Sequence, residues 1–460
     1  MKMKINKVFV LFLIFTMGIA LVSNQYATIS IQSSEQIEEV RLNKSYSAAY
    51  TAHDPIWIQS NQEFIDQAAL ESWPGDGSEG DPFIITGYSF NQETQPLRIW
   101  DTDVHWQFIN NRVDGVGDDI QCGTWIETVS NGAIIDCEFL NRHSGMIIMD
   151  VENFTISGNY VHDATANGIE VMTMITNCDI TDNIVDDINH NGILVAGMTS
   201  GSISGNEVTD CGRRGISVTS GFYNSELKSN TITGVEEEGI FVQMATNSEM
   251  SFNTISLVED VGMAVIGFNT CLLKNNTIDS VTGSGMSVDY CELSNITMNN
   301  IENCTEIGIE SLGGTNTSII QNTVSDCDGY AISLNEDTDF FEIKNNVFLN
   351  NGGGCQLNDD GENNIFIYNY YSDWLSPDAD SDNFVDLPYE ADGTADNSDD
   401  WPVTTMGHNP SPTTTTTTTT TSETTTGTGT TPDLSMTLII AGGAVAVIVL
   451  IAGILVLKRR

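Results

Sequence analysis

Residues 183–195 read NIVDDINHNGILV, and residues 206–218 read NEVTDCGRRGISV, so the same phrases return after 23 residues. One phrase is Gly-apolar-x-apolar, with steps of 23 or 24 residues. It starts at Gly145, Gly168, Gly192, Gly215, Gly239, Gly262, Gly285, Gly308, Ala331 and Gly354. The other phrase is an Asn-led apolar run that keeps phase with the first. It starts at Asn159, Asn183, Asn206, Asn230, Asn253, Asn276, Asn299, Asn322 and Asn345.

A period of about 23 residues is compatible with two repeat architectures, the leucine-rich repeat and the parallel β-helix. Leucine-rich units need several leucines and a helical segment, whereas these units consist of short alternating runs rich in Ile, Val, Thr, Asn and Ser. The repeat therefore favours an all-β fold, a parallel β-helix of about 23 residues per coil. Equivalent residues of successive coils would stack about 4.8 Å apart along the axis.

Three kinds of residue recur at fixed places in the predicted coil. The Asn side chains would stack inside one turn, where each amide donates to the carbonyl oxygen of the next. The Gly marks a corner with little room for a Cβ atom. Cys211, Cys304 and Cys327 occupy a slot that holds Val or Ile in other coils, which indicates apolar core residues. Cys304 and Cys327 would also stack within disulfide range, so a bridge between them is the alternative.

The two ends of the chain carry membrane-targeting patterns. Lysines precede a short apolar run at residues 8–22, the layout of a secretory signal peptide, with an uncleaved anchor as the alternative. Residues 436–457 carry no charge and are long enough, at about 1.5 Å per residue, to cross a hydrocarbon core of about 30 Å as a helix. Lys458, Arg459 and Arg460 follow directly, so we expect a single-pass cell-membrane protein with an extracellular N-terminal domain.

These patterns divide the chain into segments. They are a signal peptide (1–25), an N-terminal cap (45–96), the β-helix (97–370), an acidic C-terminal cap (371–410), a Thr-rich stalk (411–433), a transmembrane helix (434–457) and a cytoplasmic tail (458–460). Within the N-terminal cap, residues 61–73 place apolar side chains on one helical face, which predicts a helix that covers the first coil. The stalk cannot bury apolar surface, and its hydroxyl groups are candidates for glycosylation.

The chain is strongly acidic, with 63 Asp and Glu against 16 Lys and Arg and a formal net charge of -47. Such a surface repels phosphate groups and attracts cations, which argues against a nucleic-acid partner. The hydrophobic content of 40% is still enough for a core, so the acidity is interpreted as a surface property of a folded protein. Together with the Thr-rich stalk, it would suit an archaeal envelope.

One candidate site lies on the coils around residue 187. Asp163, Asp187 and Asp210 share one slot on three consecutive coils, and turn preference alone explains them, because polar turn formers fill that slot throughout. Their expected separations of about 4.8 and 9.6 Å also approximate the carboxylate spacings of glycosidases, so with Arg213 they form the catalytic candidates. Basic side chains on the same coils could hold an acidic sugar. This candidate ligand-binding set consists of His143, His190, Arg213 and Arg214.

A second candidate site follows the coils, in the acidic segment. Aspartates fall at positions 1, 3, 5 and 9 of a calcium-loop pattern. They are Asp378, Asp380, Asp382 and Asp386. Asn383 stands where Gly usually supplies a positive φ, and Tyr389 stands in place of the bidentate Glu of position 12. The alternatives are a structural calcium ion at the end of the β-helix and a solvated acidic segment without an ion.

Several phrases resemble a known group. The coils, PIWIQSNQEF (55–64), WPGDGSEGDPFIITGY (73–88) and the closing DADSDNFVDLPYE (378–390) resemble right-handed parallel β-helix proteins of microbial surfaces. This group is related to NosD-type and carbohydrate-binding β-helix domains of the pectate-lyase-like superfold. The resemblance covers residues 53–402 and implies right-handed coils. It does not separate functions, because lyases, hydrolases, binding proteins and scaffolds share the coil. The sequence lacks the Gly-His-Gly turn and the Arg-x-Lys phrase of polygalacturonases.

From these observations we expect the outer face of the helix to bind a glycan or another surface polymer. Two alternatives stay open. One is a polysaccharide lyase or glycoside hydrolase that works near Asp187 and Arg213, and the other is a structural envelope protein or adhesin without a small ligand. The expected partners are a polysaccharide or surface glycan and, through the C-terminal helix, the membrane, and calcium is the one cofactor expected.

Overall fold

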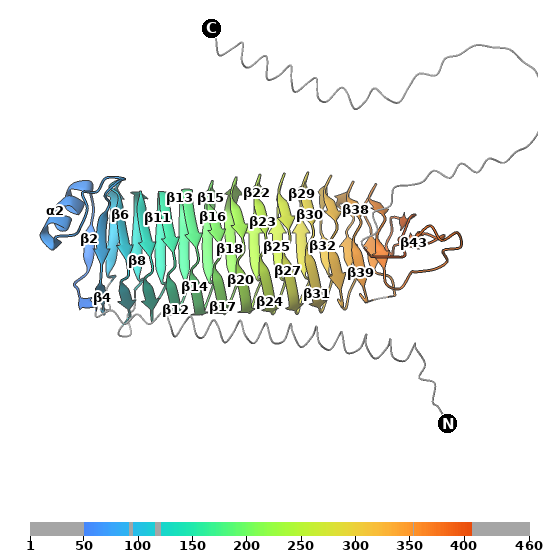
Figure 1. Ribbon diagram of the computed structural model, residues 1–460, viewed down its shortest axis with the longest axis horizontal. Coiled ribbons are helices and arrows are strands. Elements are labelled where there is room, and N and C mark those ends of the chain that lie inside the picture. The colour runs from blue at the N-terminus through green and yellow to red at the C-terminus, as the bar shows by residue number, and fades with distance from the viewer. Residues whose placement is uncertain (1–49, 92–94, 116–120, 353, 407–460) are drawn as a thin grey trace, which may run out of the picture. The chain divides into compact units, whose positions relative to one another are not determined.

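The coils stack in a row, and each coil pairs with the coil before it and the coil after it (Figure 1). This computed structural model describes residues 50–91, 95–115, 121–352 and 354–406. The predicted all-β coil is confirmed, because Ile193, Ile216 and Ile240 lie in direct register on successive parallel strands. The predicted signal peptide, stalk, transmembrane helix and tail lie outside the described residues. Within the described ranges, no helix combines the length and apolarity needed to cross a membrane.

Three faces run along the length of the β-helix. Face A is a 14-stranded parallel sheet that contains β1 (Thr51–Ala52), β4 (Tyr88–Phe90), β7 (Arg112–Asp114), β10 (Glu138–Leu140), β12 (Tyr160–Ala164), β14 (Ile184–Ile188), β17 (Glu207–Cys211), β20 (Thr231–Val235), β24 (Thr254–Val258), β27 (Thr277–Val281), β31 (Asn300–Cys304), β35 (Thr323–Ser325), β39 (Val347–Leu349) and β42 (Tyr370–Tyr371). Face B carries the Gly-apolar-x-apolar phrases. It contains β2 (Ile56–Ile58), β5 (Leu97–Thr102), β8 (Thr124–Ser130), β11 (Met146–Ser157), β13 (Ile169–Thr181), β15 (Ile193–Thr199), β18 (Ile216–Tyr223), β21 (Ile240–Gln243), β25 (Met263–Ile266), β28 (Met286–Asp289), β32 (Ile309–Ser311), β36 (Ile332–Leu334) and β40 (Leu357–Asp359).

Face C closes the coil between face B and the Asn turn. It contains the second halves of β11 and β13 together with β3 (Phe83–Thr86), β6 (Trp106–Ile109), β9 (Gly132–Ile135), β16 (Ser202–Ser204), β19 (Glu226–Lys228), β23 (Glu249–Ser251), β26 (Leu272–Lys274), β30 (Asn295–Thr297), β34 (Ser318–Ile320), β38 (Glu342–Lys344), β41 (Ile365–Ile367) and β44 (Ser398–Asp399). Short strands add to the corners. They are β22 (Ala245–Thr246), β29 (Cys291–Glu292), β33 (Gly314–Thr315) and β37 (Thr338–Asp339). After the last coil, β43 (Tyr389–Glu390) pairs antiparallel with β44.

The interior is a continuous apolar column. Side chains alternate between interior and solvent along each strand, so Val185 and Ile188 of β14 are buried while Asp186 faces outward. Val185 is in register with Val208, which is in register with Ile232. Each such side chain contributes about 1.5–3 kcal/mol by leaving water. The coil is therefore held together by contacts with its two neighbouring coils.

The Asn ladder is confirmed. The Nδ2 atom of each ladder Asn donates to the Oδ1 atom of the next at 2.9–3.1 Å, from Asn159 to Asn369, and the last acceptor is Asp399 at 3.0 Å. One assignment was wrong: the ladder uses Asn346 and not Asn345, because the preceding step is 24 residues long. Asn345 lies instead on the outer corner, with φ 54°.

The corners explain the recurring Gly and the polar turn residues. A Cβ atom on Gly239 would lie 2.5 Å from Ile255 Cγ2 and 2.6 Å from the Gly262 carbonyl oxygen, so the predicted lack of room is confirmed. Other corners require left-handed backbone, as at Asp187 (φ 53°) and Ser200 (φ 57°). Asp, Asn, Ser and Gly are frequent at such corners because short polar residues and Gly adopt this conformation most readily.

Both ends of the β-helix are covered (Figure 1). At the first coil, α2 (Asn61–Glu71) begins after the N-cap Ser60 and buries Phe64 and Ala68 against the core. Strand pairing begins at Thr51, so the β-helix starts before the predicted boundary at residue 97; this first coil lacks the repeat phrases. At the last coil, the Tyr371 and Tyr389 rings stack with centroids 3.8 Å apart.

All nine cysteines of the chain lie in the described residues and are free. Cys211, Cys304 and Cys327 are each 2% exposed, which confirms their assignment to the core. The alternative of a bridge between Cys304 and Cys327 is not what the structure shows, because both cysteines are free.

Candidate functional site

The three candidate aspartates occupy one turn on consecutive coils. Asp163, Asp187 and Asp210 end the strands β12, β14 and β17 of face A and have φ values of 54°, 53° and 51°. The same left-handed turn continues beyond them through Gly234, Leu257, Ser280, Asn303 and Asp326. The turn requirement therefore accounts for the residue type at this slot, and the carboxylates are exposed by the same geometry.

An open groove of about 500 Å³ lies beside this turn. Its floor is formed by core and small residues, including Ile188, Gly212 and Gly234. Its walls are polar and belong to four consecutive coils. They are formed by Asp187, Asn189, Asp210, Glu236 and Glu259. Four of these five wall residues are acidic and none is basic, so the groove presents hydrogen-bond acceptors.

The carboxylates of the turn are crowded. The pKa of Asp187 is raised, first by partial burial and then by the negative charges of Asp163, Asp186 and Asp210. Like charges at close spacing disfavour the ionised form of Asp187. The acidic wall residues attract cations and hydroxyl donors to the groove over anions.

The predicted ligand-binding residues lie in a column next to the groove. His143, His190 and Arg213 follow the axis, since Arg213 N donates to the His190 carbonyl oxygen at 3.2 Å. Arg213 forms a bidentate ion pair with Glu237, with distances of 2.9 and 3.2 Å. Arg214 forms another with Glu238, at 2.6 and 3.0 Å. An acidic sugar would have to displace these carboxylates.

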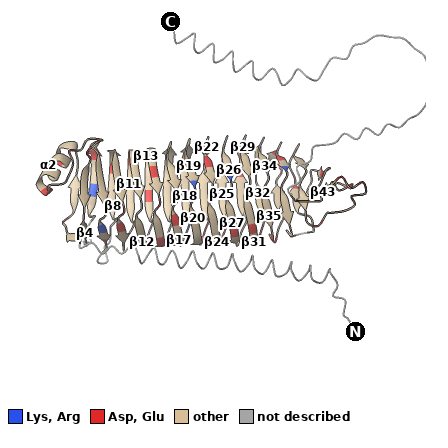
Figure 2. Cartoon of the chain, viewed as in Figure 1, with Lys and Arg blue, Asp and Glu red and all other residues tan. Residues whose placement is uncertain are grey.

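Arg214 is further held by Phe241 of face B, because the Arg214 Cζ atom lies 3.8 Å from the centroid of the Phe241 ring. His143 Nδ1 lies 3.3 Å from Thr165 Oγ1. Figure 2 shows Lys and Arg at far fewer positions on the β-helix than Asp and Glu. The excess of acid in the sequence is thus present along the coils, and the predicted basic patch is locally neutralised by the next coil.

A charged cluster on face A was missed by the sequence analysis. His162 Nε2 lies 3.5 Å from Glu138 Oε1, and His162 Nδ1 lies 2.6 Å from Asp163 Oδ2. Burial alone would lower the pKa of His162, but the hydrogen bonds to these two carboxylates raise it overall. The Tyr160 ring stacks on the imidazole with centroids 4.1 Å apart, and Arg112 lies 3.4 Å from Glu138.

Each ring nitrogen of His162 lies within 3.5 Å of a carboxylate oxygen, so this cluster is suited to hold the strands together and poorly suited to accept a proton from a ligand. Register counting could have found it, because Glu138 aligns with Arg112 and Tyr160 on adjacent strands. Glu138 precedes the first repeat phrase in the sequence, and this is why the spacing of the phrases did not reveal it.

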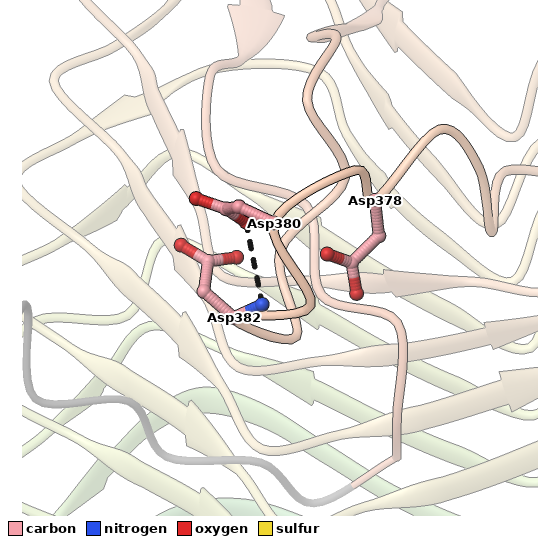
Figure 3. Close-up of side chains that lie close together, drawn as sticks. All are labelled: Asp378, Asp380 and Asp382. Atoms are coloured by element: carbon pink, nitrogen blue, oxygen red, sulfur yellow. Dashed lines mark hydrogen bonds between the residues drawn. The ribbon is translucent and has the colours of Figure 1, made fainter.

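The acidic loop brings three of its four predicted calcium ligands together (Figure 3). One carboxylate oxygen from each of Asp378, Asp380 and Asp382 lies within 4.8 Å of the others. Asp378 Oδ1 is buried and has no hydrogen-bond partner in the described chain. Asp386, predicted at position 9, is not in this group, because its Oδ2 accepts a hydrogen bond from Ala379 N at 2.7 Å. Asn383 has φ 74°, as expected for the turn.

Solved structures share this fold. The A-module of the mannuronan C-5 epimerase AlgE6 of Azotobacter vinelandii has a TM-score of 0.50 and 15% identity, over 65% of this chain and 91% of that chain. The AlgE4 A-module of the same organism has a TM-score of 0.47 and 13% identity, over 70% and 96%. The Dettilon tailspike protein has a TM-score of 0.44 and 14% identity, over 70% and 64%.

The search of curated proteins found no match. A family model does match this chain. The model described as "Right handed beta helix region" matches residues 97–183, 167–300 and 260–383, which together cover more than half of the chain. With the coil register and the Asn ladder on the same residues, this protein belongs to the right-handed β-helix family.

Proposed function

We propose that this protein binds a polysaccharide in the groove between Asp187 and Glu259. The observation that carries the proposal is the groove itself: five polar side chains from four consecutive coils surround a volume of about 500 Å³ above a floor of small and apolar residues. Four coils extend over about 14 Å, so a polymer that lies along the axis would meet a new polar side chain at each coil.

The chemistry of the groove favours sugars without acidic groups. Ionised carboxylates only accept hydrogen bonds, and sugar hydroxyls are matching donors. Arg213 and Arg214 next to the groove are neutralised by Glu237 and Glu238, so no free cation supports an acidic sugar there. The epimerase A-module with this fold is named for mannuronan, a polysaccharide. This name agrees with the polymer class proposed for the groove.

The test is binding of the full chain to an array of neutral and acidic glycans. The double change Asp187→Asn and Asp210→Asn keeps residues that tolerate the left-handed turn but removes two charged acceptors. Asp326→Asn is the matched control, because Asp326 has the same turn conformation (φ 54°) and does not line the groove. We expect the double variant to lose at least tenfold in affinity and the control to bind as wild type. Equal binding by all three proteins would refute the groove.

A second candidate function is glycoside hydrolysis by Asp163 and Asp187. The raised pKa of Asp187, which ends a strand on the coil next to that of Asp163, favours it, because glycosidases pair a protonated acid with an ionised carboxylate. Asp187 would protonate the leaving oxygen and Asp163 would act as the ionised partner. The test is the release of reducing ends from a bound polysaccharide, with loss of release in Asp187→Asn. Binding without any release would eliminate the enzyme.

We also propose that calcium binds to the acidic loop. Three carboxylates converge, and the buried Asp378 Oδ1 lacks a partner, so the donor set fits a hard cation that prefers oxygen. The ion would hold the end of the β-helix and take no part in glycan binding. Calcium titration should raise the melting temperature of wild type but not of Asp378→Asn with Asp380→Asn. The same rise in both proteins would refute this site.

Export and membrane anchoring are proposed on the sequence alone. The apolar runs at residues 8–22 and 436–457 and the basic residues after the second run support them. Digestion of intact cells by added protease should remove the β-helix domain and leave a short membrane-bound remnant. Complete protection of the domain in intact cells, with digestion after lysis, would refute the surface location.

A further inference from the structure

Three of the seven tryptophans gather on the outer surface of face B at its first coils. Trp57 lies on β2, Trp100 on β5 and Trp125 on β8, at positions that alternate with buried residues and therefore face outward. Trp57 is 56% exposed. The cluster lies before the first repeat phrase, so the repeat does not explain it.

Arg98 lies in the middle of this cluster. It is in register with Trp57 on one side and with Trp125 on the other, so the three side chains form a row along the axis. The Arg98 Cζ atom lies 4.5 Å from the centroid of the Trp100 ring and 6.0 Å from that of Trp125. The guanidinium is thus held among aromatic rings.

Arg98 has no acidic partner among the described residues, unlike three other arginines of the chain. Arg112, Arg213 and Arg214 each lie within 3.1 Å of a carboxylate oxygen. The Nε atom of Arg98 is buried without a hydrogen-bond partner in the described ranges. An uncompensated guanidinium with free N–H donors is a site for an external carboxylate, which it can bind in a bidentate manner.

Two of the three indole rings are fixed in place by their own hydrogen bonds. Trp57 Nε1 donates to the Gln95 carbonyl oxygen at 3.0 Å, and Trp125 Nε1 donates to Glu127 Oε2 at 3.0 Å. Fixed aromatic side chains bind at a low cost in conformational entropy. A pyranose ring has an apolar C–H face that can cover an indole, so rigid indoles in a row suit a chain of sugar rings.

From this arrangement we propose that Trp57, Arg98, Trp100 and Trp125 form a second binding site, for a polysaccharide that contains uronic acid. The polymer would lie along the axis of face B, with sugar rings on the indoles and one carboxylate on Arg98. The net charge of -47 opposes a polyanion at long range. At physiological ionic strength, charges beyond about 8 Å are largely screened, so the direct contact with Arg98 decides the preference.

This inference does not depend on the groove of face A, because it uses other residues, another face and another class of sugar. Two variants separate the sites. Arg98→Gln removes the charge of the second site, and Arg213→Gln removes the other arginine that could hold an acidic sugar. Trp57→Ala removes an exposed ring, so it tests the stacking contact in a variant whose fold is undisturbed.

The experiment is calorimetric titration of the full chain with polygalacturonate oligomers in EDTA, compared with the same oligomers after reduction of their carboxyl groups. We expect wild type to bind the acidic oligomer at least tenfold more tightly than the reduced one. Arg98→Gln should remove this preference, Trp57→Ala should weaken both oligomers, and Arg213→Gln should bind as wild type.

Three results would overturn the proposal. They are equal affinity of wild type for the two oligomers, loss of the preference in Arg213→Gln instead of Arg98→Gln, and absence of binding to the acidic oligomer by a folded wild-type chain. Failure here leaves the groove of face A intact, because that site is tested with other variants.

Discussion

Replacing one ladder Asn by Ala should cost as much stability as removing a large core side chain. The side chain of Asn230 is fully buried and makes four hydrogen bonds. Its Nδ2 donates to the Ile203 carbonyl oxygen and to Asn253 Oδ1, both at 3.0 Å. Its Oδ1 accepts from the backbone N and the Nδ2 of Asn206, at 3.0 and 2.9 Å.

The magnitude follows from these four bonds. A buried hydrogen bond contributes about 1 kcal/mol net, and a buried group left without a partner costs about 1–3 kcal/mol. Asn230→Ala removes four hydrogen bonds and leaves the Ile203 carbonyl and the Asn206 N–H without the Asn230 side chain as a partner. We therefore expect a loss of about 4 kcal/mol in the free energy of unfolding. Asn230→Asp keeps the shape of the side chain and loses its donors, so it should be at least as destabilising at pH 7.

The assay is urea denaturation followed by circular dichroism, with hydrogen exchange to locate the loss. Thr231→Ala is the matched control, because Thr231 is the exposed neighbour on the same strand. We expect the control to lose less than about 1 kcal/mol. Exchange in Asn230→Ala should rise first in β17, β20 and β24, because each coil contacts only its neighbours. A loss in Asn230→Ala no larger than in Thr231→Ala would refute the account of the ladder.

Three further predictions follow from the corners, the His162 cluster and the buried thiols. Gly239→Ala should destabilise the chain by about 1–3 kcal/mol in denaturation, because its Cβ would meet the core at 2.5 Å; an unchanged midpoint would contradict the crowded corner. The raised pKa of His162 means that protonation stabilises the fold, so stability should fall as pH rises through that pKa, and His162→Gln should lose this dependence in melts at pH 6 and pH 9. Burial raises the pKa of Cys137, Cys211 and Cys291 to about 12, so these thiols should react with iodoacetamide only after denaturation, and labelling of the native protein would be evidence against their burial.

The spacing of the phrases was sufficient to predict the coil, because the repeat records the same contacts at every turn. It predicted the Asn ladder and the crowded Gly corner, which the structure confirms. It failed where the chain departs from the phrase. The wrong ladder residue, Asn345, arose at a 24-residue step, and the first coil was missed because tryptophans and prolines replace the repeat there.

The candidate site was less predictable, for a reason that is also physical. A phrase shows which residues stack, but it does not mark the carboxylates of Glu237 and Glu238. These residues follow Arg213 and Arg214 by 24 residues and pair with them. The same spacing, applied to charges, would have predicted both ion pairs. The tryptophan row on face B needed the register of β2, β5 and β8, which no repeat marks.

The ladder has a direction, since every amide donates to the side-chain oxygen of the next coil, and it ends on Asp399. Asp399 is fully buried, and its carboxylate accepts from the Asn369 backbone N and Nδ2, both at 3.0 Å, and from Tyr371. An amide at this place would offer a further donor to whatever coil came next. A carboxyl group has no N–H groups to donate to a following coil. The last coil is thereby chemically unlike the others, and it gives the solenoid a terminator that discourages end-to-end growth onto another molecule.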